Sequence, residues 1–306
     1  MTSDQKVWFD GELVDFEAAN THFLSHSLHY GLGAFEGIRA YKTVDGRTAV
    51  FRLPEHMRRL LDSCRCATIE APYSVPQLVE ATLQVLRANQ LTACYIRPLV
   101  WLGRGTIKVG GHDNIIHTAI AAWTWGAYLG DKALTDGVQC TISSFTRMSI
   151  GSNLEKAKIT GQYTNSVLAK RDANMKGFDE ALLLDAQGYV SEGSGENIFV
   201  VRDGIVRTPP HGASILAGLT RDTVMQLLRA EGIEVREEMI TRSQLFMADE
   251  VFLTGTAAEI TPVRSVDGRK IGAGTRGPIT EKAQSLYLSA VRGERAERNE
   301  AWLSYV

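Results

Sequence analysis

Two lysines stand close together in a short charged run of the chain. Lys156 and Lys158 lie within Leu154–Tyr163, just before Gly161. A lysine amine can attack a carbonyl carbon when its pKa is lowered, which burial or a nearby cation achieves. A charged surface turn is the simpler interpretation of the same run. The lysines alone leave both alternatives open.

A second run combines acids with backbone freedom. Glu192 and Glu196 stand among three glycines in Gly188–Asn197, directly before an apolar strand. A purely solvated loop would not need that freedom. A third run, residues 252–260, ends a strand in small residues whose amides can form an anion-binding nest. A lysine, an acid and an anion nest are compatible with more than one chemistry.

Two further patterns favour structural interpretations. The glycines of Gly31–Gly37 lack the Lys-Ser/Thr ending of a phosphate loop, so they indicate close backbone approach in a packed region. His22, His26 and His29 have helical spacing, but no acidic or cysteine ligands lie nearby in the sequence. This favours packing or polar surface over a metal site.

The composition is that of a folded globular protein. With 306 residues, the chain is long enough for two domains or one large barrel-like unit. Its 33 basic and 35 acidic residues leave a net charge of −2, too balanced for a nucleic-acid partner. Acidic residues near the N-terminus argue against a secretory signal. The longest weakly polar run, residues 115–127, is too short for a membrane span and predicts a buried strand.

Cysteine usage indicates a reducing compartment. The four cysteines (Cys64, Cys66, Cys94 and Cys140) form no C-x-x-C pair and no disulfide framework. Cys64 and Cys66 would point apart on a helix, and we interpret both as buried small hydrophobic residues. We therefore expect a cytoplasmic protein.

The elements that must position these residues are interleaved strands and helices. Asp-Gly pairs at 10–11, 45–46 and 203–204 predict turns between antiparallel strands. Apolar spacing predicts helices from Pro54 to Cys64 and over residues 75–89, 163–175, 221–231 and 279–291. Strands are predicted over residues 94–101, 115–123, 138–143, 181–185 and 250–253. This order predicts an α/β protein of mixed α+β layers.

The glycine-containing segment Trp125–Gly130 predicts the domain boundary. We predict an N-terminal α/β domain over residues 1–125, an interdomain segment over 126–134 and a C-terminal α/β domain over 135–306. The C-terminal domain would carry the lysine run.

Nine collinear segments carry the distinctive residues of the chain. They are WFDGELV near 7–14, SHSLHYGLGAFEGIRAY at 25–41, FRLPEHMRRLLDS at 51–63, YIRPLVWLG at 95–103, WGAYLG at 125–130, AKITGQYTNS at 157–166, GYVSEGSGENIFVV at 188–201, ILAGLTRD at 215–222 and ADEVFLTGTAAEITPVRSVDG at 248–268. Together they resemble the branched-chain amino-acid aminotransferases over nearly the whole chain.

This resemblance implies a two-domain, fold-type IV enzyme that holds pyridoxal 5′-phosphate between its domains. The implied reaction is a ping-pong transamination between leucine, isoleucine or valine and 2-oxoglutarate, which gives branched-chain 2-oxo acids and glutamate. The implied partners are these small molecules and a second copy of the chain. We expect at least a homodimer, or a hexamer of dimers, with no nucleic acid, membrane or metal.

The resemblance also implies roles in the cofactor site. Lys158 corresponds to the lysine that binds the cofactor covalently and later moves a proton. Lys156 is its competitor, but Lys158 stands three residues before Gly161 and five before a tyrosine, as in the family. Glu192 corresponds to the carboxylate that keeps the pyridine nitrogen protonated, with Glu196 as the second candidate. The remaining implied cofactor contacts are Arg59, Tyr163, Leu219, Thr220 and Thr256, whereas the neighbouring Arg58 is interpreted as a surface residue.

The implied substrate pocket combines aromatic residues with one arginine. Its residues are Phe35, Tyr30, Tyr95, Arg97, Val109, Trp125, Tyr128, Tyr163, Thr256 and Ala257, of which Tyr30 and Val109 would reach into the partner's site. Arg97 stands between Ile96 and Pro98 on an apolar strand. Burying a guanidinium is costly unless an anion meets it, so we expect Arg97, helped by the hydroxyls of Tyr30 and Tyr128, to pair the distal carboxylate of glutamate.

Two segments depart from the family's pattern. Ile159–Gln162 stands where many relatives have smaller residues and a glycine pair, and Arg104–Gly111 departs from the usual glycine-rich form. D-amino-acid aminotransferases, (R)-amine transaminases and aminodeoxychorismate lyase share the fold. Tyr95–Arg97 and Gly255–Ala258 favour the branched-chain members. A cofactor-binding protein without turnover would not need Lys158.

Overall fold

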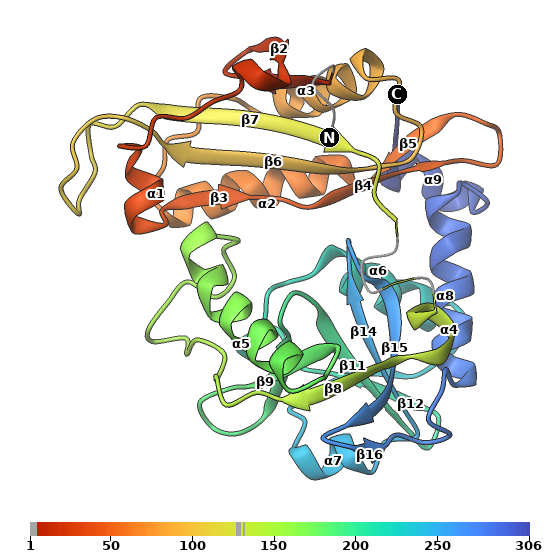
Figure 1. Cartoon of the computed structure of the whole chain (residues 1–306). Helices are drawn as coiled ribbons and strands as arrows, with labels where there is room; N and C mark the ends of the chain where they lie inside the picture. The colour runs from red at the N-terminus through yellow and green to blue at the C-terminus, as the bar shows by residue number, and fades with distance from the viewer. Residues whose placement is uncertain (1–4, 127–129, 131) are drawn as a thin grey trace. The chain divides into compact units, whose positions relative to one another are not determined.

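The computed structural model describes residues 5–126, 130 and 132–306, which form two compact units. The first unit contains the described residues up to Trp125 together with Ala157–Tyr163 and Ala290–Val306. The second contains the described residues of Gly126–Lys156 and of Thr164–Ser289. Both units combine a sheet with helices (Figure 1), which confirms the predicted mixed α/β class.

The first unit is built on an antiparallel sheet. Its strands follow the order β17-β5-β4-β6-β7-β1-β2, and β3 pairs with β6 beside this path. The strands are β1 (Lys6–Phe9), β2 (Glu12–Asp15), β3 (Gly33–Phe35), β4 (Ile38–Lys42), β5 (Thr48–Phe51), β6 (Cys94–Leu102), β7 (Ile116–Trp123) and β17 (Leu303–Tyr305). Every pairing described among these strands is antiparallel, so the unit is organised by hairpins.

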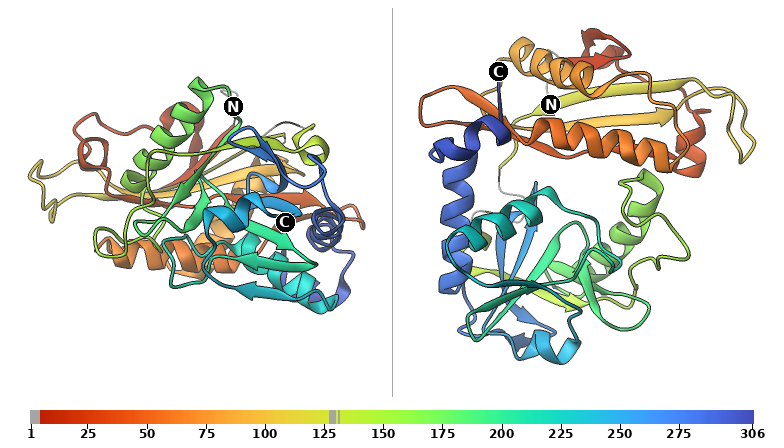
Figure 2. Two further views of the ribbon diagram at one scale, coloured as in Figure 1. Left: turned by 90° about the horizontal axis from the view of Figure 1, so that it is seen from below. Right: turned by 180° about the vertical axis from the view of Figure 1, so that it is seen from behind.

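Two long helices cover this sheet. They are α2 (Leu53–Cys66) and α3 (Val75–Ala88), which run along the strands in Figure 1 and, from behind, in Figure 2. On α2, Met57, Leu60 and Cys64 recur at helical spacing and all lie in the core. Shorter elements of the unit are η1 (Phe16–Ala18), α1 (His26–Tyr30), η2 (Thr160–Gln162) and α9 (Ala296–Trp302).

The second unit is built on a mixed sheet in the order β10-β9-β8-β15-β14-β11-β12-β13, with β16 paired to β15. Its strands are β8 (Val138–Ile142), β9 (Glu180–Leu184), β10 (Val190–Gly193), β11 (Asn197–Arg202), β12 (Ile205–Thr208), β13 (Val235–Glu237), β14 (Glu250–Gly255), β15 (Glu259–Val266) and β16 (Arg269–Lys270). Its helices are α4 (Ala133–Asp136), α5 (Tyr163–Met175), α6 (Leu219–Ala230), α7 (Arg242–Phe246) and α8 (Pro278–Val291). Ala169 and Ala173 of α5 pack on Ala181 and Leu183 of β9.

The predicted long helices and strands are confirmed within a few residues. The first hairpin turns at Asp10 and Gly11, which both have positive φ, as a tight hairpin turn requires. The strand predicted over residues 115–123 is β7. No helix in the described part of the chain is long and apolar enough to cross a membrane.

The units differ from the predicted domain boundaries in two segments. Residues 157–163, which include Lys158, belong to the first unit because Ile159 bridges Ala34 and the Gly161 amide donates to the Gly31 carbonyl at 2.7 Å. The last strand, β17, also belongs there because it pairs with β5. Assigning all of residues 135–306, with the lysine, to a C-terminal domain therefore does not match these contacts.

Candidate active site

The amine of Lys158 is positioned from both its backbone and its side chain. The Lys158 N–H donates to Ser63 Oγ at 2.9 Å, and its carbonyl accepts from the Phe35 N–H at 3.1 Å. The Lys158 Nζ donates to Tyr163 Oη at 2.7 Å and lies 4.9 Å from the ring centroids of both Phe35 and Tyr163. This arrangement holds one amine at a fixed place beside two aromatic rings.

The same unit gathers the predicted aromatic residues around Arg97. Because side chains alternate along a strand, Tyr95 and Arg97 of β6 share the face opposite the fully buried Ile96. Arg97 Nη2 donates to Tyr95 Oη at 3.0 Å, and its guanidinium carbon lies 4.9 Å from the Phe35 ring centroid. Trp125 packs edge-on against Tyr95 at 4.5 Å. The cluster offers an apolar wall with one cation.

Arg59 of α2 is held by a buried carboxylate. Arg59 Nε and Nη2 donate to the two oxygens of Glu36 at 2.6 and 2.9 Å, and His56 Nδ1 lies 2.7 Å from Glu36 Oε2. Burial opposes ionisation of the wholly buried Glu36, but Arg59 and His56 outweigh it and hold the Glu36 pKa well below its usual range. Burial lowers the pKa of His56, and the Glu36 carboxylate opposes this effect. The guanidinium orientation is thus fixed by a bidentate ion pair.

The second unit contains a buried carboxylate of a different kind. Glu192 of β10 lies 2.6 Å from Arg147 Nε in an ion pair, and both side chains are more than nine-tenths buried. Glu192 Oε2 accepts from Asn197 Nδ2 and from the Leu216 N–H, each at 3.0 Å. A cation and two neutral donors therefore surround this carboxylate.

Side chains also fix the loop that precedes α6. Lys156 Nζ donates to the carbonyls of Ala213 and Ile215 at 2.7 and 2.9 Å. The carbonyls of Ser214 and Leu216 accept from Ser191 Oγ and Asn197 Nδ2. Burial lowers the pKa of Lys156. The Lys156 amine is thus used to hold this loop.

The loop ends at the N-terminus of α6, where Leu219 and Thr220 lie. Gly218 is the N-cap residue and has an extended backbone conformation. The first amides of a helix carry the positive end of its dipole and suit an anion. Thr256 and Ala257 lie half-buried in the turn between β14 and β15. These segments contain the predicted anion contacts of the second unit.

Glu196 lies in a less favourable environment for an ionised carboxylate. Burial raises the pKa of Glu196 to about 8, and the neighbouring Glu180 carboxylate contributes to the increase. Among the contacts described for it, the Glu196 carboxylate accepts from the Gly195 N–H at 3.1 Å. At neutral pH this side chain is protonated, unlike a carboxylate that must stabilise a cation.

The chain matches the family described as amino-transferase class IV over residues 33–266. It is 48% identical over 303 residues to the branched-chain-amino-acid aminotransferase of Pseudomonas aeruginosa, covering 99% of this chain and 98% of that protein. The corresponding protein of Escherichia coli K12 is 45% identical, covering 98% and 97% of the two chains. The chain belongs to the class IV aminotransferases.

A solved structure agrees with this assignment. The crystal structure of the T.th. branched-chain amino acid aminotransferase with pyridoxamine 5′-phosphate superposes on the present chain with a TM-score of 0.95. The two sequences are 46% identical, and the match covers 100% of the present chain and 99% of the T.th. chain. The resemblance to the branched-chain aminotransferases and the two-domain α/β fold of that family, both predicted from the sequence, are confirmed.

The predicted site residues of this class IV aminotransferase are divided between the two units. The first unit gathers Phe35, Arg59, Tyr95, Arg97, Trp125, Lys158 and Tyr163. The second unit contains Glu192, Leu219, Thr220, Thr256 and Ala257. Tyr128 lies outside the described residues. Arg58, interpreted as a surface residue, is exposed.

Tyr30 and Val109 lie apart from the Lys158 contacts described above. Val109 is 77% exposed and Tyr30 is 46% exposed. The Tyr30 hydroxyl donates to the Ile107 carbonyl at 3.0 Å, and His26 Nε2 lies 3.0 Å from the Lys108 carbonyl. The departing segment Arg104–Gly111 is therefore tied to α1. This places the two predicted pocket residues on an exposed surface.

Five residues of this arrangement were not predicted from the sequence: Glu36, His56, Ser63, Arg147 and Asn197. Glu36 could have been predicted, because it is a carboxylate between Phe35 and Gly37 in an apolar region. A charge in such a region needs a partner, which is the argument that identified Arg97. The others depend on contacts between segments distant in the sequence, and their residue types alone are ordinary.

Other sequence patterns have structural explanations. His29 Nε2 lies 2.9 Å from the Phe23 carbonyl, and His22 Nδ1 accepts from the Leu24 N–H, so both rings bond to nearby backbone. Cys64 is buried, and burial raises its pKa to about 12. The interpretation of Cys66 as buried was wrong, because the i, i+2 spacing turns it to the exposed side of α2.

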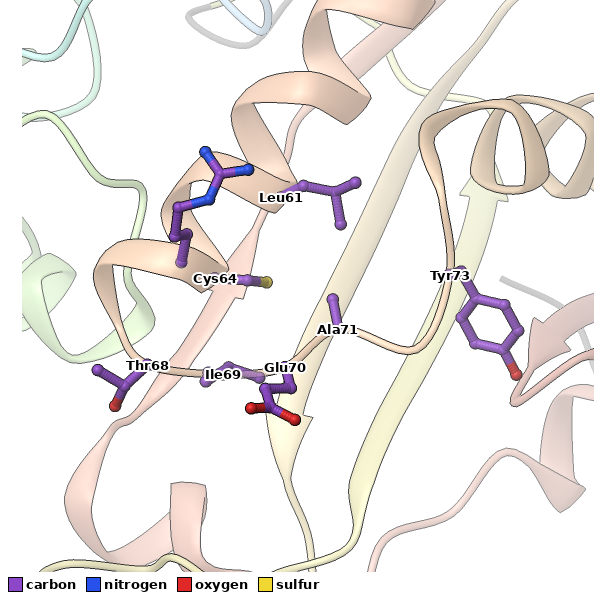
Figure 3. Close-up of a pocket in the computed structure, with 8 residues that line it drawn as sticks. Leu61, Cys64, Thr68, Ile69, Glu70, Ala71 and Tyr73 are labelled. Atoms are coloured by element: carbon purple, nitrogen blue, oxygen red, sulfur yellow. The ribbon is translucent and has the colours of Figure 1, made fainter.

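A surface hollow of about 410 Å³ lies beside the end of α2 (Figure 3). Leu61, Ile69 and Ala71 supply apolar parts of its lining. Its thiol, on Cys64, is un-ionised near pH 7 because burial raises the Cys64 pKa. The thiol in this hollow is therefore not an activated nucleophile.

Proposed function

We propose that this protein is a pyridoxal 5′-phosphate-dependent aminotransferase that exchanges amino groups between branched-chain L-amino acids and 2-oxoglutarate. The observation that carries the proposal is the Lys158 amine, held at 2.7 Å by the Tyr163 hydroxyl in a class IV aminotransferase. Relatives of up to 48% identity are named branched-chain-amino-acid aminotransferases. One structure of the T.th. enzyme is complexed with N-(5′-phosphopyridoxyl)-L-glutamate, which supports glutamate as one substrate.

The donor set fits pyridoxal 5′-phosphate, which presents an aldehyde, a phosphate and a pyridine nitrogen. Lys158 supplies an amine for the aldehyde, and Glu192 a buried carboxylate for the pyridine nitrogen. Arg59 and the amides of Leu219 and Thr220 suit the phosphate. When bound, the cofactor supplies a sink for the electrons left as the substrate loses its α-proton.

The protein's own groups then have distinct tasks. The Lys158 Nζ accepts the proton from the substrate α-carbon and returns it, and Tyr163 Oη keeps that amine in place. Glu192 holds a proton on the pyridine nitrogen, and Arg147 stabilises the Glu192 charge. Thr256 binds the phosphate, and together with the Ala257 amide it binds the substrate α-carboxylate.

The aromatic cluster must accept both an aliphatic and an acidic side chain. Phe35, Trp125 and Tyr163 enclose the branched side chain of leucine, isoleucine or valine. Tyr95 helps to bind the α-carboxylate. Arg97, at the polar end of the cluster, pairs the distal carboxylate of glutamate, which would be prohibitively costly to bury alone.

The Arg97 assignment has a specific test. In Arg97→Leu we expect kcat/KM for glutamate to fall by roughly two to four decades, as for one lost partner of a buried charged pair at about 3–5 kcal/mol. The value for leucine should stay within several-fold. Both half-reactions are measured by stopped-flow absorbance. Equal losses for the two substrates would show that Arg97 only braces β6.

The function itself is tested by incubating the purified protein with L-leucine and 2-oxoglutarate. We expect stoichiometric glutamate and the branched-chain 2-oxo acid, detected by mass spectrometry. D-leucine and (R)-1-phenylethylamine serve as alternative amino donors. Turnover of these donors without turnover of L-leucine would assign the protein to another class IV activity.

We further propose a cytoplasmic homodimer, with the hexamer of dimers as a larger assembly of it. The exposed Tyr30 and Val109 support a partner subunit, since the family resemblance assigns both residues to the neighbouring site. The free thiols of Cys64, Cys66, Cys94 and Cys140 support a reducing compartment.

A further inference from the structure

One buried hydroxyl joins the backbones of the two residues proposed to bind the aldehyde and the phosphate of the cofactor. Ser63 of α2 is 1% exposed. Its Oγ donates to the Arg59 carbonyl at 2.8 Å and accepts from the Lys158 N–H at 2.9 Å. A serine hydroxyl has one proton and two lone pairs, so it can make both bonds at once.

The rest of α2 makes this connection rigid. His56, Arg59 and Ser63 follow at spacings of three and four, so they share one side of the helix. The Glu36 carboxylate fixes the first two of them, and core residues such as Met57 and Leu60 fix the helix itself. Arg59 therefore cannot shift without α2, and Ser63 ties the Lys158 backbone to the same helix.

This spacing matters because the aldehyde and the phosphate arm of the cofactor are attached to neighbouring carbons of one ring. A protein that binds both groups gains affinity only if its two binding residues are held at a separation that this ring and arm can span. We propose that Ser63 is a positioning residue that sets the separation between Lys158 and Arg59, and so lets the phosphate contribute to binding at Lys158. The inference rests on the proposed function, and it concerns cofactor affinity rather than the chemical step.

The test compares pyridoxal 5′-phosphate with pyridoxal, which has the aldehyde but lacks the phosphate. Dissociation constants of both are measured by equilibrium dialysis on the full chain after the cofactor has been removed. The dissociation constant of pyridoxal divided by that of pyridoxal 5′-phosphate reports how much the phosphate adds to the affinity. In Ser63→Ala we expect this ratio to fall by roughly ten-fold, the effect of about one lost hydrogen bond, while pyridoxal affinity stays within about three-fold.

The chain offers a matched control in Thr82 of α3. Thr82 is fully buried, and its Oγ1 donates to the carbonyl four residues earlier, Leu78, at 2.8 Å, as Ser63 does to Arg59. Thr82→Val should lower the melting temperature comparably and leave the affinity ratio unchanged. Ser63→Thr, which keeps the hydroxyl, should restore most of the ratio.

Each outcome decides the inference. An unchanged ratio in Ser63→Ala, or an equal fall in Thr82→Val, would overturn it. If Ser63→Ala does not fold, Ser63→Cys replaces it, and a ratio equal to that of the unaltered protein would count against the inference in the same way. Failure of the unaltered protein to form a borohydride-trapped bond with the cofactor would instead overturn the proposed function.

Discussion

Lys156 and Lys158 are two residues apart, yet their amines have different partners. Lys156 Nζ donates to two backbone carbonyls of the loop before α6, whereas Lys158 Nζ donates to a phenol oxygen beside aromatic rings. The two backbone carbonyls hold the Lys156 amine firmly in the loop. They also occupy the directions from which the aldehyde of a cofactor would have to approach this amine. This difference supports the proposal that Lys158, and not Lys156, forms the covalent bond.

We predict that Lys158→Ala abolishes the cofactor–lysine bond that borohydride traps, with transamination reduced to background. Lys156→Ala should retain the trapped bond while loosening the loop at Ala213–Leu216. Peptide mass mapping after borohydride treatment locates the modified lysine in each variant. A label on Lys156 in the unaltered protein would refute the assignment.

Glu196 makes stability depend on pH. Because burial raises its pKa in the folded protein to about 8, above the usual 4.5, the folded state holds this proton more tightly than the unfolded state. The stabilisation is present below about pH 4.5 and is lost as the pH rises through 8. We predict that Glu196→Gln, which cannot ionise, has a higher melting temperature than the unaltered protein above pH 8.

This difference should shrink towards pH 5, where the unaltered side chain is protonated. Melting temperatures from pH 5 to 9.5 measure it by calorimetry, with the exposed Glu12→Gln as control. Parallel curves for Glu196→Gln and the unaltered protein would show that Glu196 does not carry the raised pKa.

At the residue scale, the sequence predicted side chains that are unusual for their surroundings. Arg97 stands out because a charge on an apolar strand needs an explanation, whereas Lys158 and Glu192 were chosen from ambiguous runs by the family resemblance. Ser63 and Arg147 do not stand out, since a helical serine and a surface-type arginine are common. Their roles arise only from contacts with residues distant in the sequence, which residue types and spacing do not encode.

At the scale of elements, two glycines bring η2 against the end of α1. Gly31 ends α1 with φ of +73°, and its carbonyl accepts from the Gly161 N–H at 2.7 Å. A Cβ on Gly161 would lie 2.9 Å from the Gly31 carbonyl oxygen. The departing residue Thr160 also donates to this carbonyl, so the segment that carries Lys158 and Tyr163 is fixed by backbone contact.

We predict that Gly161→Ala lowers the free energy of unfolding by about 1–3 kcal/mol, because backbone rather than a flexible side chain must move. It should also reduce kcat, since Lys158 lies three residues away. Urea denaturation and steady-state kinetics measure the two effects. Gly151→Ala, where a Cβ would meet nothing within 4 Å, should change neither. Full stability of Gly161→Ala would mean that the close approach is not required.

The elements that the sequence predicted are those with a strong local signal. Asp-Gly turns and apolar spacing predicted the hairpins and the long helices, including α2 and α3. The strands β10, β15 and β17 were not predicted. β10 lies in a glycine-rich run, β15 contains Pro262, and β17 is three residues long. Such strands form because a neighbouring strand pairs with them, which a local pattern does not reveal.

At the scale of the whole molecule, the first unit is assembled from three separate stretches of the chain. Residues 157–163 enter it through a bridge between Ile159 and Ala34, and the C-terminus enters it through pairing of β17 with β5. A domain boundary predicted from composition divides the chain at one place. It does not detect that later segments of the chain pack back into the first unit. The lysine therefore belongs with Arg59 and Arg97, although more than fifty residues separate it from either.

The first unit also exposes an apolar surface, which we propose is covered by a second copy of the chain in the homodimer. Six large apolar side chains of this surface are 45–77% exposed. They lie on residues 23–30 and on residues 107–109: Phe23, Leu24, Leu28, Tyr30, Ile107 and Val109. The contacts Tyr30 to Ile107 and His26 to Lys108 join the two segments, so the side chains form one face rather than scattered points. Contiguous exposed apolar faces mark interaction sites.

We predict that Val109→Asp weakens the dimer, because association would bury an unpaired carboxylate. The dissociation constant of the dimer should rise by at least ten-fold in sedimentation or light scattering. Specific activity should then fall with dilution in parallel with the dimer fraction, since Val109 is proposed to complete the partner's site. Val44→Asp changes a valine that is 64% exposed in the β4–β5 turn and should alter neither property. A fully active monomer of the unaltered protein, or a Val109→Asp dimer of normal affinity, would mean that this face does not bind a partner subunit.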